Sequence, residues 1–280
     1  AATSAVTDAP KPVPDIGLII VGDEILSGKR ADKHLSKTIE LLGERGLNLS
    51  WARYVGDDRR HITAALRDAF AQPGLVFSCG GIGATPDDHT RQCAAAALDR
   101  PLVLHPQARE LILERMQDVA REQGTAFEPE RADNVHRLNM GVFPEGAAIV
   151  PNPYNKIPGF DCTGSGGGRV FFLPGFPVMA WPMMAWALDT HCRAWFHRQV
   201  WVERSVIVFG AMEASLTPLM ERIEAEHPGV KVFSLPSVDH PTYGRHIELG
   251  VKGDTGATLP AFDALKQGLT VFGAPLGPEM

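Results

Sequence analysis

Three apolar segments in the first ninety residues each end in a loop of glycines and acids, and each loop leads into a helical pattern. The segments span 16–21, 47–55 and 75–79, and the loops after them are Gly22-Asp23-Glu24, Gly56-Asp57-Asp58 and 80–90. Repeated strand–loop–helix units predict an α/β domain with a three-layer, mainly parallel sheet. Ligands bind at the carboxyl ends of the strands in such sheets. We therefore expect the three loops to converge on one ligand.

The third loop says most about the ligand, and it reads Cys79-Gly80-Gly81-Ile82-Gly83-Ala84-Thr85-Pro86-Asp87-Asp88-His89-Thr90. Glycine lets the backbone approach a ligand closely, and a helix N-terminus favours phosphate. Two adjacent carboxylates repel a phosphate unless a divalent cation such as Mg²⁺ lies between them. The loop thus predicts a Mg²⁺-assisted site for a phosphorylated ligand. Its expected ligand-binding residues are Gly80, Gly81, Gly83 and Thr85, and its expected metal ligands are Asp87 and Asp88.

Helix capping is the alternative for several of these residues. Thr85 as N-cap, Pro86 at the first helical position and an acid in the first turn make a good helix start. Capping does not require three glycines or two adjacent acids. In the second loop, one of Asp57 and Asp58 is expected to cap a helix, and the other is free to bind metal or activate water.

The remaining candidates lie in the first loop and in a Pro/Gly-rich segment near residue 155. Gly22, Asp23 and Glu24 are expected to contact the ligand, with solvated loop acids as the alternative for the two carboxylates. Lys156 is expected to meet a phosphate as a point charge, with a solvated surface lysine as the alternative. His34 and His89 fit polar groups at helix ends better than general bases, because their spacing shows no partner.

Composition restricts the partners. The chain has 280 residues and a net charge of −6, and no Lys/Arg-rich stripe predicts nucleic-acid binding. Its four cysteines are far apart, which favours reduced, buried thiols. The longest apolar stretch, 178–188, contains Pro182 and is too short to span a membrane. With no secretory leader visible, we expect a cytoplasmic protein without a membrane partner.

We divide the sequence into a disordered arm (1–13), the α/β domain (14–198), a small α+β domain (199–273) and a tail (274–280). A new pattern of strands and helices that begins at Trp201 motivates the second boundary. A predicted helix with Trp181, Trp186, Trp195 and two methionines fits the core or a subunit interface. We expect a homo-oligomer, with a dimer favoured over a trimer.

An ordered set of motifs resembles the molybdopterin-binding family, in which the chain is most similar to the N-terminal part of the CinA-like competence/damage-inducible proteins. The resemblance covers about 14–272, and the motifs are Gly22-Asp23-Glu24-Ile25-Leu26-x-Gly28, Asp32, Val55-Gly56-Asp57-Asp58, 80–90, Pro144-Glu145-Gly146-Ala147, Asn152-Pro153, Pro158-Gly159-Phe160 and Leu173-Pro174-Gly175-x-Pro177.

The resemblance implies the molybdopterin-binding fold and a phosphorylated pterin or nucleotide as ligand, with molybdopterin a possible cofactor in molybdenum cofactor biosynthesis. It implies catalytic and Mg²⁺-binding roles for Asp57 and Asp88, and it adds Asn152 and Gly175 to the ligand-binding residues. The resemblance to CinA-like proteins implies a second hypothesis, that the chain is a pyrophosphatase for ADP-ribose-type diphosphates.

The sequence departs from the family pattern at four places. Ala84 stands where the family usually has proline, and His34 stands where it has asparagine. Met179 replaces a glutamate, and Asn155-Lys156 replaces Gly-Thr. Replacing a carboxylate by Met179 and gaining Lys156 favours a more anionic ligand. It is also compatible with a non-catalytic carrier or sensor of molybdopterin. Whether the chain is an enzyme therefore stays open at this stage.

Overall fold

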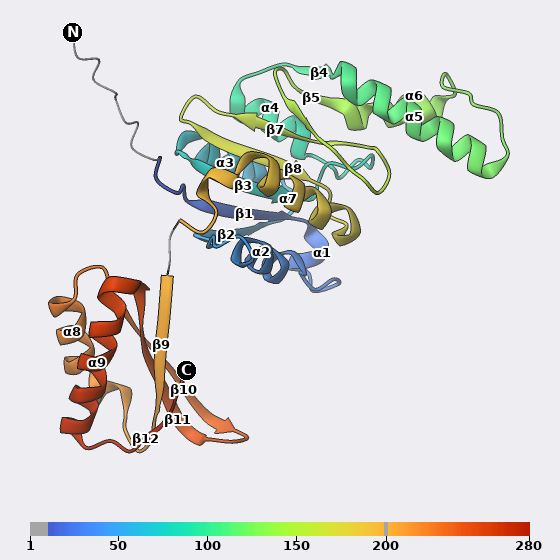
Figure 1. Ribbon diagram of the computed structural model, residues 1–280. Coiled ribbons are helices and arrows are strands. Elements are labelled where there is room, and N and C mark those ends of the chain that lie inside the picture. The colour runs from blue at the N-terminus through green and yellow to red at the C-terminus, as the bar shows by residue number, and fades with distance from the viewer. Residues whose placement is uncertain (1–10, 199–200) are drawn as a thin grey trace, which may run out of the picture. The chain divides into compact units, whose positions relative to one another are not determined.

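The computed structural model describes residues 11–198 and 201–280, and the chain divides into two compact units between His197 and Arg198 (Figure 1). Residues 1–10 of the expected N-terminal arm lie outside the described residues. Val13, at the end of that arm, packs against the core of the first unit.

The first unit is built on a six-stranded sheet in the order β2-β1-β3-β8-β7-β6. The first four strands run parallel, and β7 and β6 are added antiparallel. The fold class predicted from the sequence is therefore confirmed for this unit. The strands are β1 (Ile16–Val21), β2 (Trp51–Val55), β3 (Gly74–Cys79), β6 (Ala148–Val150), β7 (Gly159–Thr163) and β8 (Gly168–Leu173).

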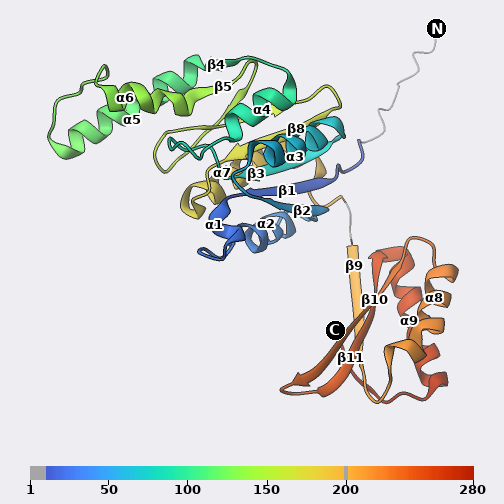
Figure 2. The same ribbon diagram turned by 180° about the vertical axis from the view of Figure 1, so that it is seen from behind.

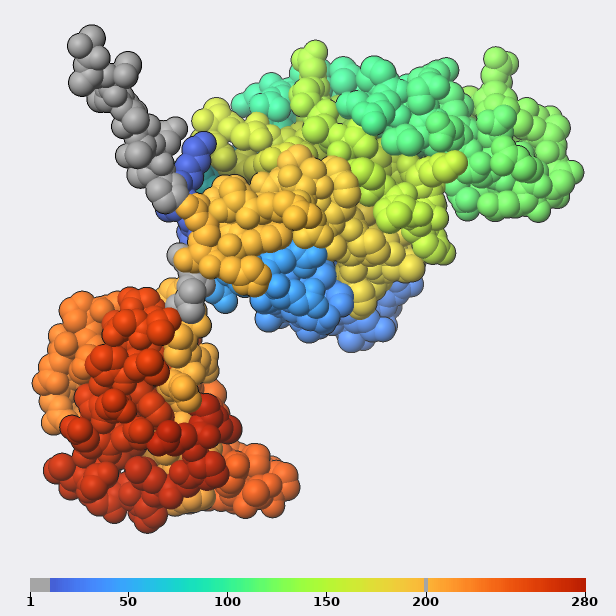
Figure 3. Space-filling view, viewed as in Figure 1, coloured from blue at the N-terminus to red at the C-terminus, as the bar shows by residue number. Residues whose placement is uncertain are grey.

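Both faces of this sheet are covered, which gives three layers (Figure 2). One core joins the sheet to α3 and α4, and the other joins it to α2 and α7. The helices α2 and α7 also lie side by side on the surface drawn in Figure 3. The bounds are α1 (Asp23–Leu26), α2 (His34–Gly43), α3 (Arg59–Ala71), α4 (Thr90–Leu98) and α7 (Pro177–His191).

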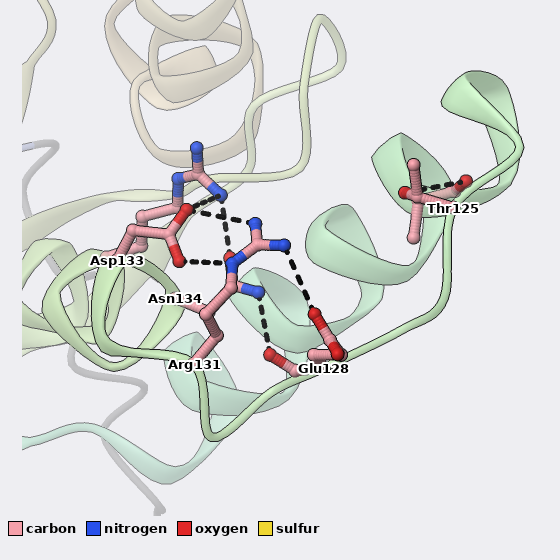
Figure 4. Close-up of polar contacts among 7 residues, drawn as sticks. Thr125, Glu128, Arg131, Asp133 and Asn134 are labelled. Atoms are coloured by element: carbon pink, nitrogen blue, oxygen red, sulfur yellow. Dashed lines mark hydrogen bonds and ion pairs between the residues drawn. The ribbon is translucent and has the colours of Figure 1, made fainter.

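Residues 102–144 of the first unit carry α5 and α6 beyond the sheet (Figure 1). We call this segment the arm, as distinct from the N-terminal residues. Figure 4 shows the turn into α6, where Arg131 pairs with Asp133 and Glu128. Asn134 donates to the Glu128 carbonyl, which holds this turn closed. The arm consists of β4 (Leu102–Leu104), α5 (Pro106–Gln123), α6 (Ala132–Arg137), the 3₁₀ turn η1 (Leu138–Gly141) and β5 (Val142–Pro144).

Several local expectations are wrong. The helix after the glycine loop begins at Thr90, five residues beyond the expected cap. The Pro/Gly-rich segment near residue 155 lies between two short strands, β6 and β7. Trp195 lies in the 3₁₀ turn η2 (Arg193–Trp195) and not on α7. The two methionines of this helix, Met183 and Met184, are fully buried, which confirms the core alternative for them.

The second unit has four strands in the order β10-β11-β9-β12 with a β-α-β-β-α-β chain order, the split βαβ arrangement. A core of aliphatic residues joins this sheet to α8 and α9. The expected tail 274–280 is wrong, because it contains β12, which pairs with β9. The elements are β9 (Trp201–Val208), α8 (Glu213–Glu226), β10 (Lys231–His240), β11 (Gly244–Asp254), α9 (Thr255–Phe272) and β12 (Leu276–Glu279). Across the described parts of both units, no helix combines the length and the apolar character needed to cross a membrane.

Candidate functional site

A cavity of about 990 Å³ lies at the carboxyl ends of β1, β3 and β8 in the first unit. All three acidic loops contribute to its lining, as the parallel sheet requires. Of the residues predicted from the sequence, Gly22, Glu24, Asp57, Gly80, Gly81, Gly83, Thr85, Asp87, Asp88, Asn152 and Gly175 line this cavity, whereas Asp23 and Lys156 do not.

The glycine loop needs its first two glycines for conformational reasons. Gly80 and Gly81 have φ angles of 107° and 72°, a region that favours glycine. A Cβ atom on Gly80 would lie 2.3 Å from the carbonyl oxygen of Val21. The Gly80 N–H donates to the Leu173 carbonyl at 2.9 Å, which ties the start of the loop to the end of β8.

Asp23 and Asp57 hold the first two loops together by a reciprocal pair of hydrogen bonds. The Asp23 N–H donates to Asp57 Oδ2 at 3.0 Å, and the Asp57 N–H donates to Asp23 Oδ1 at 2.9 Å. Burial, together with the charges of Asp23, Glu24 and Asp87, raises the pKa of the Asp57 carboxyl. Asp23 therefore links the loops, and Asp57 brings its carboxyl to the cavity.

The structure decides which acid of the second loop is the helix cap. Asp58 is the N-cap of α3, because its Oδ1 accepts from the N–H groups of Arg60 and His61 at 2.8 and 3.2 Å. These hydrogen bonds lower the pKa of Asp58. Asp57 takes no part in this cap.

The acids of the third loop form a tight turn, so the helix-capping alternative for Thr85 is wrong. The carboxylate of Asp88 accepts from the Thr85 N–H at 2.9 Å and from the Thr85 hydroxyl at 2.8 Å. The same hydroxyl lies within hydrogen-bonding distance of Asp87, and this contact is the main reason for the lowered pKa of Asp87. These contacts hold both carboxylates at the cavity wall.

The acids alone do not build a metal site. Within residues 11–198 and 201–280, no group of three or more His, Cys, Asp or Glu side chains is placed to hold a metal ion. Mg²⁺ is usually bound by one or two carboxylates together with water and substrate phosphates. The carboxylates of Asp57, Asp87 and Asp88 fit that ligand set, with water and the oxygens of a phosphorylated ligand in the remaining positions.

His34 is buried and holds the β8–α7 loop, a role that the sequence did not reveal. Its Nε2 donates to the Gly175 carbonyl at 2.8 Å, and its Nδ1 accepts from the indole N–H of Trp181 at 3.3 Å. Because a carbonyl only accepts and an indole only donates, these partners fix the Nε2–H tautomer. His34 thereby shapes the wall that carries Gly175.

The lining near Gly175 combines uncharged and basic side chains, because the Arg30 guanidinium lies 5.9 Å from the centre of the Phe176 ring and Lys33 also lines the cavity. Asn152 is 5% exposed, and its amide N–H groups lie close to Asn155 Oδ1, the Ile157 carbonyl and the Met179 sulfur. These bonds use the Asn152 side chain to fix its own loop. Met179 places a thioether on this wall.

Lys156 does not reach the cavity. Its Nζ lies 2.7 Å from Asp118 and 3.7 Å from Glu114, both on α5. The charge of Lys156 is therefore directed to the arm, and the expected contact with a phosphate is wrong for this conformation. A pairing between residues 38 positions apart has no local signal in the sequence.

Comparisons with known proteins agree with this architecture. Residues 17–192 match the family model described as "Probable molybdopterin binding domain". A CinA-like protein of Anaeromyxobacter dehalogenans is 35% identical over 163 residues, which cover 58% of this chain and 37% of that relative. The chain thus spans little more than a third of the length of this CinA-like relative.

Two further relatives extend the comparison. A protein of Pyrobaculum calidifontis is 29% identical over 238 residues, which cover 84% of this chain and 87% of the relative. The crystal structure of the protein CinA with unknown function from Thermoplasma acidophilum superimposes with a TM-score of 0.52 and 28% sequence identity. The matched residues make up 63% of this chain and 96% of the Thermoplasma chain. The resemblance inferred from the motifs is confirmed: the chain belongs to the molybdopterin-binding domain family and is similar to CinA-like proteins.

Proposed function

We propose that this protein binds a phosphorylated pterin or nucleotide in the cavity of the first unit, with Mg²⁺ between its carboxylates and the phosphates of the ligand. The observation that carries the proposal is the convergence of three acidic loops, the third of them glycine-rich, on a single cavity. Its volume of about 990 Å³ suits a ligand of nucleotide or pterin size.

The side chains that line the cavity suit the two parts of such a ligand. Glu24, Asp57, Asp87 and Asp88 lie on the loops after β1, β2 and β3, where Mg²⁺ would offset their charge. The cavity is also lined by the uncharged side chains of Asn152, Ile157, Met179 and Phe176, which suit a ring, and by the cations Arg30 and Lys33, which suit a phosphate. The acids with Mg²⁺ and the two cations therefore serve the phosphates, and the uncharged side chains serve the heterocycle.

Hydrolysis of a nucleotide diphosphate is the second candidate, and one observation favours it. Asp57 lines the cavity, and burial raises the pKa of its carboxyl. A carboxylate of raised pKa is a better base toward an attacking water. In ADP-ribose that water would attack one phosphorus and break the bridging P–O bond, giving AMP and ribose 5-phosphate, while Mg²⁺ would supply charge neutralisation.

A calorimetric titration of ADP-ribose into the full chain, with Mg²⁺ and with EDTA, tests the proposal. We expect binding that weakens at least about tenfold when Mg²⁺ is removed. ³¹P NMR of the same samples separates the two candidates, because AMP and ribose 5-phosphate appear only if the diphosphate is cleaved. Mass spectrometry of ligand extracted from freshly purified protein then distinguishes a pterin from a nucleotide. The proposal would be contradicted if neither a phosphorylated pterin nor a nucleotide bound to the protein.

A non-catalytic carrier or sensor of molybdopterin is the third candidate. Fluorescence of a pterin that co-purifies with the protein, together with ADP-ribose that stays uncleaved in the ³¹P NMR samples, would support it. The thioether of Met179, in place of the carboxylate usual in the family, is the feature of this cavity that favours such a protein.

A further inference from the structure

The carbonyl groups of the glycine loop are all bound on the protein side. The Gly80 carbonyl accepts from the Thr90 hydroxyl at 3.1 Å, and the Gly81 carbonyl accepts from the Thr90 N–H at 3.0 Å. The Ile82 and Gly83 carbonyls accept from Arg91, the latter at 2.8 Å. His136 Nε2, on the arm, lies 3.2 Å from the Ala84 carbonyl. Five consecutive carbonyls are therefore satisfied.

The N–H groups of the same loop show the opposite pattern. Within the described residues, no protein acceptor is present for the N–H groups of Gly81, Ile82, Gly83 and Ala84, and all four residues line the cavity. Gly81, Gly83 and Ala84 are partly exposed, so their N–H groups are open to water or to a ligand. Successive free N–H groups in such a turn form a concave site for an anion.

Arg91 sets the direction of two of these N–H groups. The peptides of this loop are trans, because no cis peptide bond occurs in the described chain. In a trans peptide the C=O of one residue and the N–H of the next point in opposite directions. Since the guanidinium holds the carbonyls of Ile82 and Gly83, it directs the N–H groups of Gly83 and Ala84 away from itself.

The guanidinium also brings a buried charge to the loop. Arg91 is 5% exposed, and its guanidinium donates to carbonyl oxygens, with no salt bridge to a carboxylate of the described residues. Burial lowers the pKa of Arg91, and the charge of Asp88 offsets this only in part. A buried charge is costly unless it is paired, and Asp88 is a neighbouring acid but not a salt-bridge partner. An anion bound by the loop would add to the counter-charge that Asp88 provides.

We propose that Arg91 is the positioning residue of a backbone cradle for a phosphoryl group, formed by the N–H groups of residues 81–84. This inference rests on the proposed function and names the part of the cavity that holds the phosphate. Arg91 does not contact the ligand: it fixes the peptides that do, and its charge offsets that of the anion. A lone arginine at the start of an alanine-rich helix carries no signal of this role in the sequence.

Three variants of the full chain test the inference with inorganic pyrophosphate and Mg²⁺ as the probe. Arg91→Met removes both carbonyl contacts and the charge, whereas Arg91→Lys keeps the charge but lacks the planar guanidinium that spans two carbonyls. Arg67→Met on α3 is the control, because Arg67 is exposed and does not line the cavity. Affinity is measured by calorimetry, and the amide resonances of Gly83 and Ala84 are followed by NMR.

We expect Arg91→Met to weaken pyrophosphate binding about tenfold or more, Arg91→Lys to lie between it and the parent, and the control to match the parent. Gly83 and Ala84 should respond to pyrophosphate in the parent and lose that response in Arg91→Met. Parent-like affinity in either Arg91 variant would overturn the inference while leaving the proposed function intact. If Arg91→Met does not fold, Arg91→Lys alone decides. A parent that binds neither pyrophosphate nor ADP-ribose would overturn the proposed function and this inference with it.

Discussion

Two adjacent acids, Asp57 and Asp58, should respond to substitution in opposite ways. Partial burial and the charges of three neighbouring acids raise the pKa of the Asp57 carboxyl. Asp58, in contrast, is the N-cap of α3. In Asp57→Asn, the side-chain oxygen still accepts from the Asp23 N–H, but the unfavourable charge is gone. We therefore expect Asp57→Asn to stabilise the ligand-free protein and Asp58→Ala to destabilise it.

The expected size of the gain is modest. Asp57 is partly exposed, so solvent screening limits the stabilisation to at most about 1 kcal/mol. For a unit of this size that corresponds to an increase in Tm of about 2–4 °C. Asp58→Ala removes the acceptor for two N–H groups of α3 and should lower Tm by about 2–4 °C.

The gain in Asp57→Asn should also depend on pH with a defined sign. Because the pKa of this carboxyl is higher in the folded protein, its contribution favours folding below the unfolded value of about 3.9 and is lost as pH rises through the folded pKa. At about pH 3 the parent and Asp57→Asn should therefore have equal stability, and the difference should appear as pH rises toward neutral.

Scanning calorimetry in EDTA, at pH values from about 3 to 7, measures these effects. With Mg²⁺ and ADP-ribose present, the order should reverse, because the parent keeps the carboxylate that the metal needs. If Asp57→Asn destabilised the ligand-free protein at neutral pH, the reasoning that places Asp57 as a repelled, ligand-directed acid would be refuted.

Three further outcomes are expected. Asp88→Asn retains an acceptor for the Thr85 N–H and should stay folded, but calorimetry should show Mg²⁺-dependent ADP-ribose binding weakened about 10–100-fold, and parent-like binding would contradict this. Lys156→Gln should leave that binding unchanged, because Lys156 pairs with Asp118, and a clear loss of affinity would show that the lysine reaches the ligand. Light scattering at micromolar concentration should reveal a homodimer, and a sole species of 30.3 kDa would exclude it.

The convergence of the three loops was predictable from the sequence, because parallel strands place their carboxyl ends at one edge. The choice between Asp57 and Asp58 was not, since either acid is a good cap and only the backbone at residue 58 decides. The role of the acids at 87 and 88 was also open, because Thr-Pro-Asp-Asp resembles a helix start and the chain instead makes a turn before α4 begins at Thr90.

Other parts of the site depend on long-range contacts that leave no local pattern. Lys156 turns to α5, His34 reaches Gly175 across 141 positions, and Arg91 acts on carbonyls that precede it by eight and nine residues. The strands β6 and β7 are short and flank a Pro/Gly-rich stretch, so the sequence pattern there gives little sign of them. Composition and periodicity report local preference, whereas these features are fixed by tertiary packing.

The central claim is that the carboxylates and the glycine loop act together on a metal-bound phosphate. A crystal of the full chain grown with ADP-ribose and Mn²⁺ in place of Mg²⁺ tests it directly, because manganese gives an anomalous signal. We predict a peak at coordination distance, about 2.1 Å, from at least one of Asp57, Asp87 and Asp88 and from a phosphate oxygen, with the same phosphate at the N–H groups of residues 81–84. An anomalous peak remote from these acids, or ADP-ribose bound outside the cavity, would contradict the account.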